Sequence, residues 1–573
     1  MNKLQLRSAQ TAGAVRANNG SKFDDWSHAQ LVAEVDRLRK RKKYGLVWEE
    51  KPEDVVEQCK TELPVLKEVS SKAIGKDDGG PVNVLIEGDN YHALSVLNYT
   101  HRGKIDLIYI DPPYNTGARD WKYNNDYVDD NDGYRHSKWL SMMNNRLVLA
   151  KKLLKRDGVL VCAIDENEQA HLGVLLEGLF PDCEIHCITV VHNPRGVQGK
   201  NFSYTHEYAF FVFRKGMQAI GDRKIAEEDI DWSNFRNWGS ESTRGDAKNC
   251  FYPVVVEGGK VVGFGGVVPP SVHPKSQTIK TGSKYFVFPI DTKGVERKWR
   301  YARQSVEDVA HLLRAKKTKS GYEIEIGKDF GTVRTVWQDT RYDANEYGTK
   351  IVHALVPDTD FDFPKSLWNV YDCIAPVLSE NKNAVVLDFF AGSGTTGHAV
   401  LALNKEDGGN RRFILCTNNE NNIASEVCYP RIAKVIKGYK NAKGETIDGL
   451  GGNFRYFKTA FVGAEPNDRN KEALTRQATE MLCLREDTFE PVKETGQMQI
   501  FKNGTHHTGI VFEEGAIPAL KKIIAKTGGV WSVYVFSLGD DTFDEEFADM
   551  GQKITVSPIP EVIMRVYRRL FQK

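Results

Sequence analysis

The sequence lacks the long apolar segments and cysteine patterns that mark membrane, secreted or zinc-bound proteins. No apolar run reaches the roughly 18 residues that a membrane-spanning helix needs, and the N-terminal segment contains no apolar signal core. The nine cysteines are scattered without a CxxC pair, which fits reduced thiols better than a disulfide framework or a zinc cage. We therefore expect a soluble, cytoplasmic protein.

The sequence also lacks a charge imbalance that would indicate a partner. Its 78 basic and 77 acidic residues give a formal net charge of +1. Any surface that binds nucleic acid must therefore be local. At 573 residues the chain is too long for one hydrophobic core, and roughly three or four domains of about 150 residues each are expected.

The chain divides by sequence pattern into five segments. Strand-like and helix-like stretches alternate in residues 81–216 and again in 351–454, whereas residues 217–350 are rich in glycine, proline and short aromatic runs. Such alternation is typical of an α/β fold with a mostly parallel sheet covered on both faces. We predict an N-terminal helical extension over 1–80, a separately folded insertion over 217–350, and a small α/β unit over 455–573.

The first alternating segment contains a clear order of elements. "VNVLIEG" predicts a buried strand, "DNYHALSVLNY" a helix capped by Asp89 or Asn90, and "IDLIYI" a second strand. A long helix is predicted over "YRHSKWLSMMNNRLVLAKKLLKRDG", closed by Gly158.

The insertion carries a local basic excess. Between Lys275 and Lys319 there are twelve Lys and Arg residues against four acids, so 12 − 4 = +8, and aromatic residues are interleaved with them. Basic side chains neutralise phosphates and aromatic rings stack on bases, so a nucleic-acid surface is predicted; a solvated basic loop over a small core is the alternative. The aromatic residues are Tyr285, Phe286, Phe288, Trp299 and Tyr301, and the candidate DNA contacts are Arg195, Lys200, Arg297, Lys298, Arg300 and Arg303.

A glycine-rich turn follows a strand in "VVLDFFAGSGTTGHAV". The strand leads through Gly392-Ser393-Gly394 directly into a helix, which allows a nucleotide-like ligand to approach the backbone closely. A phosphate loop is excluded because His398 stands where lysine is needed and Ala399 where serine or threonine would hold magnesium. Glu420, after the next strand, lies about where a ribose would be held. A nucleoside cofactor is therefore favoured over a triphosphate.

The second motif is "IYIDPPYNTG", in which an apolar strand stops at an acid, two prolines and an aromatic ring. The carboxylate of Asp111 and the carbonyl of Pro112 can both accept from an exocyclic amine, and Tyr114 can stack on a flipped base. In a doubly wound sheet this strand can end beside the strand of Asp388, although 388 − 111 = 277 residues separate the two acids. The motif is then a rigid clamp for an amine beside a methyl donor.

These residues carry a family resemblance. Asp-Pro-Pro-Tyr followed much later by the FxGxG of "FAGSG" resembles the S-adenosylmethionine-dependent amino-methyltransferases of DNA in the permuted beta-group order. The resemblance is strongest to modification (Mod) subunits of Type III restriction-modification systems, through "LIEGDNYHALSVL", "CAIDENE", "NPRG", "SYTHEYAFFVFRK" and the two motifs above. It covers about residues 82–216 and 360–440, and implies a Rossmann-like class I methyltransferase sheet with an inserted target-recognition domain.

The resemblance also implies roles for individual residues. Asp89 would contact the cofactor adenine and Glu420 its ribose, whereas Lys365 of "DFPKSLW" would pack over the methionine carboxylate. No metal would be required. The implied catalytic residues are Asp111, Pro112, Pro113 and Tyr114, and the remaining implied cofactor residues are Asp388, Phe390, Gly392, Gly394 and Thr395.

The resulting hypothesis is a site-specific DNA methyltransferase acting on the N6 of a flipped adenine, because an acid rather than a serine opens the Asp111 motif. Double-stranded DNA, a second copy of the chain and a separate helicase-nuclease subunit are the implied partners, with no membrane. Open alternatives are a solitary N6-adenine or N4-cytosine enzyme, a non-catalytic DNA-binding protein, and methylation of RNA or of a protein glutamine.

Overall fold

The computed structural model describes residues 26–40, 47–75, 80–198, 200–225, 230–440, 444–539, 541–550 and 553–571. The chain divides into two compact units, residues 1–48 and 49–573. The described part of the first unit contains helix α1 (His28–Lys40). All elements discussed below belong to the second unit.

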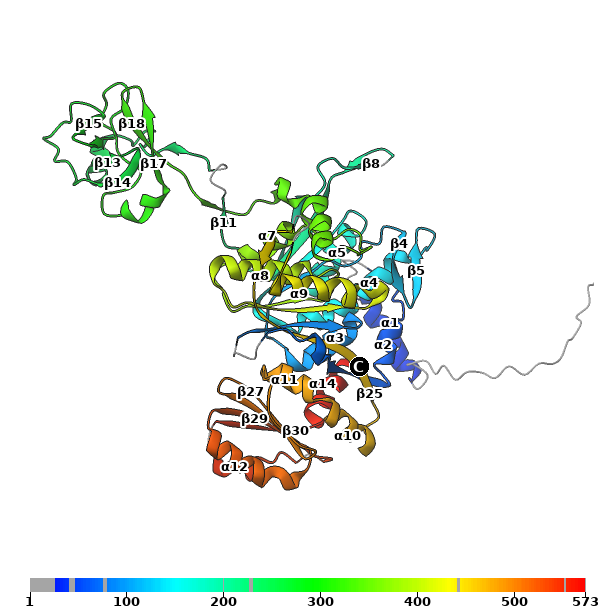
Figure 1. Ribbon diagram of the computed structural model, residues 1–573. Coiled ribbons are helices and arrows are strands. Elements are labelled where there is room, and N and C mark those ends of the chain that lie inside the picture. Colours follow the sequence, from blue (N-terminus) through cyan, green and yellow to red (C-terminus); the bar gives the residue numbers. More distant parts are fainter. Residues whose placement is uncertain are drawn as a thin grey trace, which may run out of the picture. The chain divides into compact units, whose positions relative to one another are not determined.

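A ten-stranded sheet forms the centre of the second unit (Figure 1). Its strand order is β1-β25-β2-β22-β21-β3-β6-β10-β7-β20, and the strands from β25 to β6 run parallel. This confirms the predicted α/β class with a mostly parallel sheet. The strands are β1 (Glu62–Glu68), β2 (Val82–Glu87), β3 (Ile105–Ile110), β6 (Leu154–Ile164), β7 (Cys183–Val191), β10 (His206–Arg214), β20 (Val336–Trp337), β21 (Val385–Asp388), β22 (Arg412–Thr417) and β25 (Asn453–Gly463).

The sheet reverses its direction of winding between β21 and β3. These strands are parallel neighbours, with Val386 opposite Leu107. They lie far apart in the sequence, because β3 belongs to the first segment that resembles the family and β21 to the second. From β21 the chain continues to β22 on one side, and from β3 it continues to β6 on the other. The carboxyl ends of β21 and β3 therefore form a topological switch point, where open α/β sheets bind their ligands.

Helices cover both faces of this sheet. Leu107 and Tyr109 of β3 share a core cluster with α7, α8 and α9, so Ile108 and Ile110 face the opposite layer by strand alternation. In the second set of helices, α3 packs on α4 and α4 on α5. The helices are α3 (Asn90–Thr100), α4 (Arg135–Lys151), α5 (Gln169–Leu179), α7 (Leu367–Leu378), α8 (Thr395–Asp407) and α9 (Tyr429–Lys437).

Helix α4 is shorter than its sequence pattern predicts. It ends at Lys151, and β6 starts at Leu154, so Gly158 lies inside a strand. The apolar residues of "LLKRDGVLVCAI" extend the helical pattern beyond Lys151. Leu153, in the connection between helix and strand, is buried like a residue of the helix's inner face. Periodicity alone does not separate a buried helix end from the start of a buried strand.

The insertion contains its own small β domain. One sheet has the order β12-β18-β17 and a second has the order β14-β13-β16-β15, around a core that includes Phe235, Tyr252 and Trp299. Trp337 and Tyr342, which the sequence pattern placed in the insertion, pack in the central core instead. The strands are β12 (Ser233–Asn234), β13 (Val254–Glu257), β14 (Lys260–Phe264), β15 (Thr278–Thr281), β16 (Lys284–Val287), β17 (Leu313–Thr318) and β18 (Gly321–Ile326).

The C-terminal α/β unit is a five-stranded sheet, but both predicted outer segments also contribute strands to the central sheet. Strand β1, from the predicted N-terminal extension, pairs with β25, and β25 in turn lies beside β2.

Among the described residues, no helix is both long and apolar enough to span a bilayer. The C-terminal strands are β26 (Glu490–Glu494), β27 (Met498–Asn503), β28 (His506–Val511), β29 (Val530–Phe536) and β30 (Ile554–Ile559), next to α12 (Ile517–Thr527).

Candidate active site

Loops from four adjacent parallel strands meet at the carboxyl edge of the sheet. Hydrogen bonds join them directly: the Asn90 side-chain amide donates to the carbonyl of Phe389 at 2.9 Å, and the amide of Ala391 donates to the carbonyl of Cys416 at 3.1 Å. The Asp111 corner follows β3, the immediate neighbour of β21. The two motifs therefore follow neighbouring strand ends, as a doubly wound sheet predicts; that they form one binding site stays a prediction.

The glycine turn after β21 has the backbone shape that its sequence implies. Gly394 has φ +83°, and a Cβ there would lie 3.0 Å from Sγ of Cys428. Helix α8 starts immediately afterwards, at Thr395. Only glycine fits this position without strain, and the turn leaves the first amides of α8 directed towards the carboxyl edge of the sheet.

Asp388 and Thr396 hold this turn from within. Asp388 is buried and accepts hydrogen bonds from the amide of Phe390 at 2.9 Å and the hydroxyl of Thr396 at 2.6 Å. Burial raises the pKa of Asp388 to about 7. Both carboxylate oxygens are thus used inside the loop, which places Asp388 in a supporting position beneath the predicted cofactor site.

Arg431 is a supporting residue that sequence reasoning missed. Its fully buried guanidinium, from α9, donates at 2.8 Å to the hydroxyl of Ser393 and at 2.8 Å to that of Thr395. Burial lowers its pKa to about 10. The available signal was an arginine within an amphipathic helix, which ordinarily indicates an exposed residue.

The acids predicted to hold the nucleoside follow β2 and β22. Asp89 caps α3 by accepting from the amide of Tyr91 at 2.7 Å. Glu420 is half-buried and forms an ion pair of 2.5 Å with Lys122. Phe390 is also half-buried. A partly exposed carboxylate on each of two neighbouring loops, next to a glycine turn, is a donor and acceptor set that fits a nucleoside bearing an amino-acid tail.

The Asp-Pro-Pro-Tyr corner is rigid and offers a buried acceptor that lacks a hydrogen bond. The indole of Trp139 donates to the carbonyl of Pro113 at 2.7 Å and fixes the turn, in which Pro112 is buried. Oδ1 of Asp111 is buried and accepts no hydrogen bond from the described residues. Burial raises the pKa of Asp111, and the ammonium of Lys365, 3.4 Å away, opposes that rise.

Lys365, which is predicted to pack over the methionine carboxylate, lies in this corner. Its ammonium contacts the Tyr114 hydroxyl and Oε2 of Glu207, and lies 4.6 Å from the centre of the Tyr114 ring. The Tyr114 hydroxyl also donates to Glu207 at 3.1 Å. The ammonium is therefore placed between two carboxylates, those of Asp111 and Glu207.

Glu207 is a second residue that sequence reasoning did not assign to the site. It is 3% exposed on β10, and its Oε1 accepts from the Asn369 side chain at 2.8 Å. Burial acts to raise its pKa, but the Lys365 ammonium, His192 and the hydrogen bonds from Lys365 and Tyr114 together lower it. The detectable signal was a lone acid in the otherwise apolar strand "HEYAFFVFR", since a buried charge needs a partner.

Two of the predicted DNA contacts lie near a hairpin between β7 and β10. Its strands are β8 (Val197–Gln198) and β9 (Ser203–Tyr204) (Figure 1). Arg195 and Lys200 are exposed, as are Phe202 (77%) and Tyr204 (47%). Exposed aromatic rings beside basic side chains are typical of surfaces that contact unpaired bases and phosphates.

Two of the four DNA contacts predicted in the insertion, and two of its interleaved aromatic residues, have structural roles. Trp299 and Phe288 are buried in its cores, so they are unavailable for base stacking. Arg297 pairs with Asp291 at 2.9 Å, and Arg303 donates to the carbonyl of Gly265 at 2.7 Å. A small β domain needs large apolar side chains for its own core, which explains the interleaved aromatics.

The other two DNA contacts predicted in the insertion remain accessible to a ligand. Arg300 is exposed and donates to the Ser233 hydroxyl at 3.0 Å, and Lys298 is half-buried.

Comparison with known proteins places this architecture in a family. The family model described as DNA methylase matches residues 105–427. The chain is 32% identical to Type II methyltransferase M.KpnI of Klebsiella pneumoniae over 360 residues, which cover 60% of this chain and 82% of that protein. The chain therefore belongs to the DNA methylase family. It is a DNA methyltransferase.

Two further relatives are named as Mod subunits of Type III restriction-modification enzymes. The chain is 27% identical over 384 residues to the EcoPI Mod subunit of Escherichia phage P1, a match that covers 59% of this chain and 58% of that protein. It is 30% identical over 398 residues to the StyLTI Mod subunit of Salmonella typhimurium, covering 62% and 56%. The chain thus spans a little more than half the length of these two relatives.

Proposed function

We propose that this methyltransferase transfers a methyl group from S-adenosylmethionine to the N6 amine of an adenine flipped out of double-stranded DNA. The observation that carries the proposal is the buried Oδ1 of Asp111, at a strand end adjacent to the glycine turn. It accepts no hydrogen bond from the described residues, and the Lys365 ammonium lies 3.4 Å away. A charge-balanced acceptor that still lacks a hydrogen bond is matched to an amine donor.

The corner activates the amine through its geometry. The lone pair of an exocyclic amine is delocalised into the base, so the nitrogen is a weak nucleophile. Asp111 and the Pro112 carbonyl accept from the two N–H groups and hold the nitrogen in a tetrahedral arrangement, which frees the lone pair. The turn is fixed by Trp139 beforehand, so little reorganisation accompanies the reaction.

When bound, S-adenosylmethionine supplies a methyl group on a positively charged sulfonium. Gly392 and Gly394 leave room for its methionine side, Glu420 would hold the ribose, and Asp89 would contact the adenine. Because the sulfonium charge disappears on transfer, the protein's main contribution is in-line alignment of donor and acceptor. Asp111 accepts the surplus proton of the methylated amine directly or through water.

Adenine is favoured over cytosine because an aspartate opens the motif. The names of the relatives favour a modification enzyme of a restriction-modification system, in which a second copy of the chain and a separate restriction subunit are the proposed partners. The match over 82% of M.KpnI supports a stand-alone methyltransferase as the second candidate.

The test is transfer of labelled methyl groups from S-adenosylmethionine to mixed-sequence duplex DNA, followed by digestion and separation of the nucleosides. N6-methyladenine is expected, and Asp111→Ala should abolish its formation. Asp157→Ala, at an exposed position of β6, is the matched control and should retain activity. N4-methylcytosine, label that resists DNase, or DNA binding without transfer would each contradict the proposal.

A further inference from the structure

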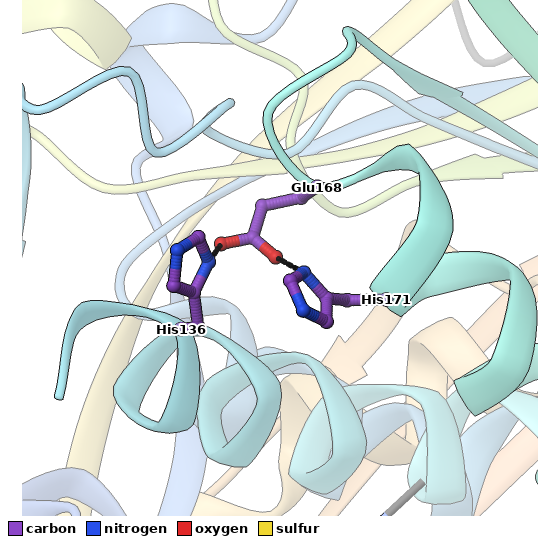
Figure 2. A group of neighbouring side chains, drawn as sticks. All are labelled: His136, Glu168 and His171. Carbon is purple, nitrogen blue, oxygen red and sulfur yellow. Dashed lines mark hydrogen bonds and ion pairs between the residues drawn. The ribbon is translucent and has the colours of Figure 1, made fainter. Parts of the chain in front are cut away.

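A cluster of two histidines and one glutamate lies behind the catalytic loop. His136 near the start of α4 and His171 in the first turn of α5 both point at the carboxylate of Glu168, which immediately precedes α5 (Figure 2). Nδ1 of His136 is 2.6 Å from Oε1, and Nδ1 of His171 is 2.8 Å from Oε2. One nitrogen from each ring and a carboxylate oxygen all lie within 4.8 Å of one another.

The cluster has a buried floor and an open side. The Glu168 side chain is fully buried, whereas the side chains of His136 and His171 are 39% and 36% exposed. Oε2 of Glu168 and Nδ1 of His171 face each other without satisfying hydrogen-bond geometry, and neither has another hydrogen-bond partner among the described residues. A buried acceptor that forms no hydrogen bond needs a positively charged or donating partner.

We propose that His136, Glu168 and His171 bind one divalent transition-metal ion of the zinc type. Two imidazoles and one carboxylate form a ligand set that suits such ions and leaves positions open for water. Metal–ligand distances of about 2.0–2.2 Å in tetrahedral geometry separate ligand atoms by about 3.3 Å. The two nitrogen–oxygen contacts therefore need to widen, and ligand atoms up to 4.8 Å apart need to move closer. The competing interpretation is that Glu168 only links the two imidazoles through charge.

The site connects directly to the catalytic loop. Asn115, the residue after Tyr114, is buried in a left-handed conformation with φ +59°. Its side-chain Nδ2 donates to Oε1 of Glu168, and its side-chain Oδ1 accepts from the indole of Trp121 at 3.0 Å. An ion that immobilises Glu168 would thus hold the loop that carries Tyr114. This is a positioning role, compatible with the expectation that methyl transfer itself requires no metal.

Arg135 provides a test of ligand geometry. Its Nε lies 3.3 Å from Nε2 of His136, so Nε2 acts as an acceptor and Nδ1 carries the proton that faces Glu168. Metal binding through Nδ1 moves that proton to Nε2, which breaks the contact with Arg135. Arg135→Gln removes both the competing donor and a repelling charge, and should tighten metal binding.

The experiment uses the full chain, stripped with a chelator, and follows binding of Zn²⁺ by calorimetry and of Co²⁺ by its visible absorption bands. One equivalent should bind, with bands typical of nitrogen and oxygen ligands and without the strong near-ultraviolet absorption of thiolate ligation. His171→Gln should weaken affinity at least about tenfold, as loss of metal-site residues commonly does. The double variant His136→Gln/His171→Gln should lose the site.

The matched control is His186→Gln. It removes an exposed imidazole on β7 that lies 3.4 Å from Glu184. Among the described residues, His186 belongs to no group of three possible metal ligands. Its metal binding should equal that of the wild type. Unchanged binding in the double variant, or no uptake by the wild type, would overturn the proposal. Thermal melts of the stripped proteins show whether each variant folds, and added Zn²⁺ should raise the melting temperature only where the site is intact.

Discussion

Replacing Lys365 by methionine tests the charge arrangement at the catalytic corner. The change keeps the length of the side chain but removes the ammonium that lies between Asp111 and Glu207. Two buried carboxylates then face each other without a cation. The pKa of Asp111, already raised by burial, should rise further because the charge that opposed this rise is gone.

The size of the effect follows from Coulomb's law. At 3.4 Å and an effective dielectric constant of about 20, a unit charge pair interacts by about 5 kcal/mol. At about 1.4 kcal/mol per pH unit, that is between three and four pH units as an upper limit, and relaxation around the vacated site reduces it. We expect the acid limb of the activity profile to move up by at least about one pH unit.

Single-turnover methyl transfer, measured across pH with saturating S-adenosylmethionine, is the assay. A protonated Asp111 no longer offers two acceptor oxygens, so Lys365→Met should be slow at neutral pH and recover in alkali. Lys365→Met/Glu207→Gln, which removes a carboxylate as well, should return the profile towards that of the wild type. An unmoved acid limb combined with weaker S-adenosylmethionine binding would refute the reasoning and favour contact of Lys365 with the methionine carboxylate.

Three further predictions concern the glycine turn and the hairpin. Because the pKa of Asp388 is raised to about 7, the stability present at low pH is lost as pH rises towards neutrality, and Asp388→Asn should flatten this dependence in denaturant melts at pH 5 and 8. Gly394→Ala should lower the free energy of unfolding by about 1–3 kcal/mol and weaken S-adenosylmethionine binding in calorimetry, because φ is +83° and Cys428 is 3.0 Å from the new Cβ. Arg195→Ala should weaken binding to all duplexes and reduce the salt dependence of binding. Phe202→Ala should instead reduce base flipping, as measured with a fluorescent adenine analogue at the target site. Equal effects of the two variants on both readouts would contradict separate roles.

The sequence determined those features that depend on neighbouring residues. Apolar runs located β3 and β21, and the Asp89 cap located the start of α3. The acid-proline-proline-tyrosine and glycine motifs located the two halves of the site, because special backbone conformations need particular residues. The rule that ligands bind where an α/β sheet reverses its winding then predicts that these halves lie next to each other.

Only the tertiary structure decided which side chains that are distant in the sequence form ion pairs or hydrogen bonds with one another. Glu207 and Lys365 are 158 residues apart in the chain, and Arg431 reaches the glycine turn from a different helix. Neither contact leaves a periodic signal, because each depends on how β10, α7 and α9 pack against the sheet. The aromatic residues of the insertion showed the same limit: exposed stacking surface and buried core have the same composition, and only packing distinguishes them.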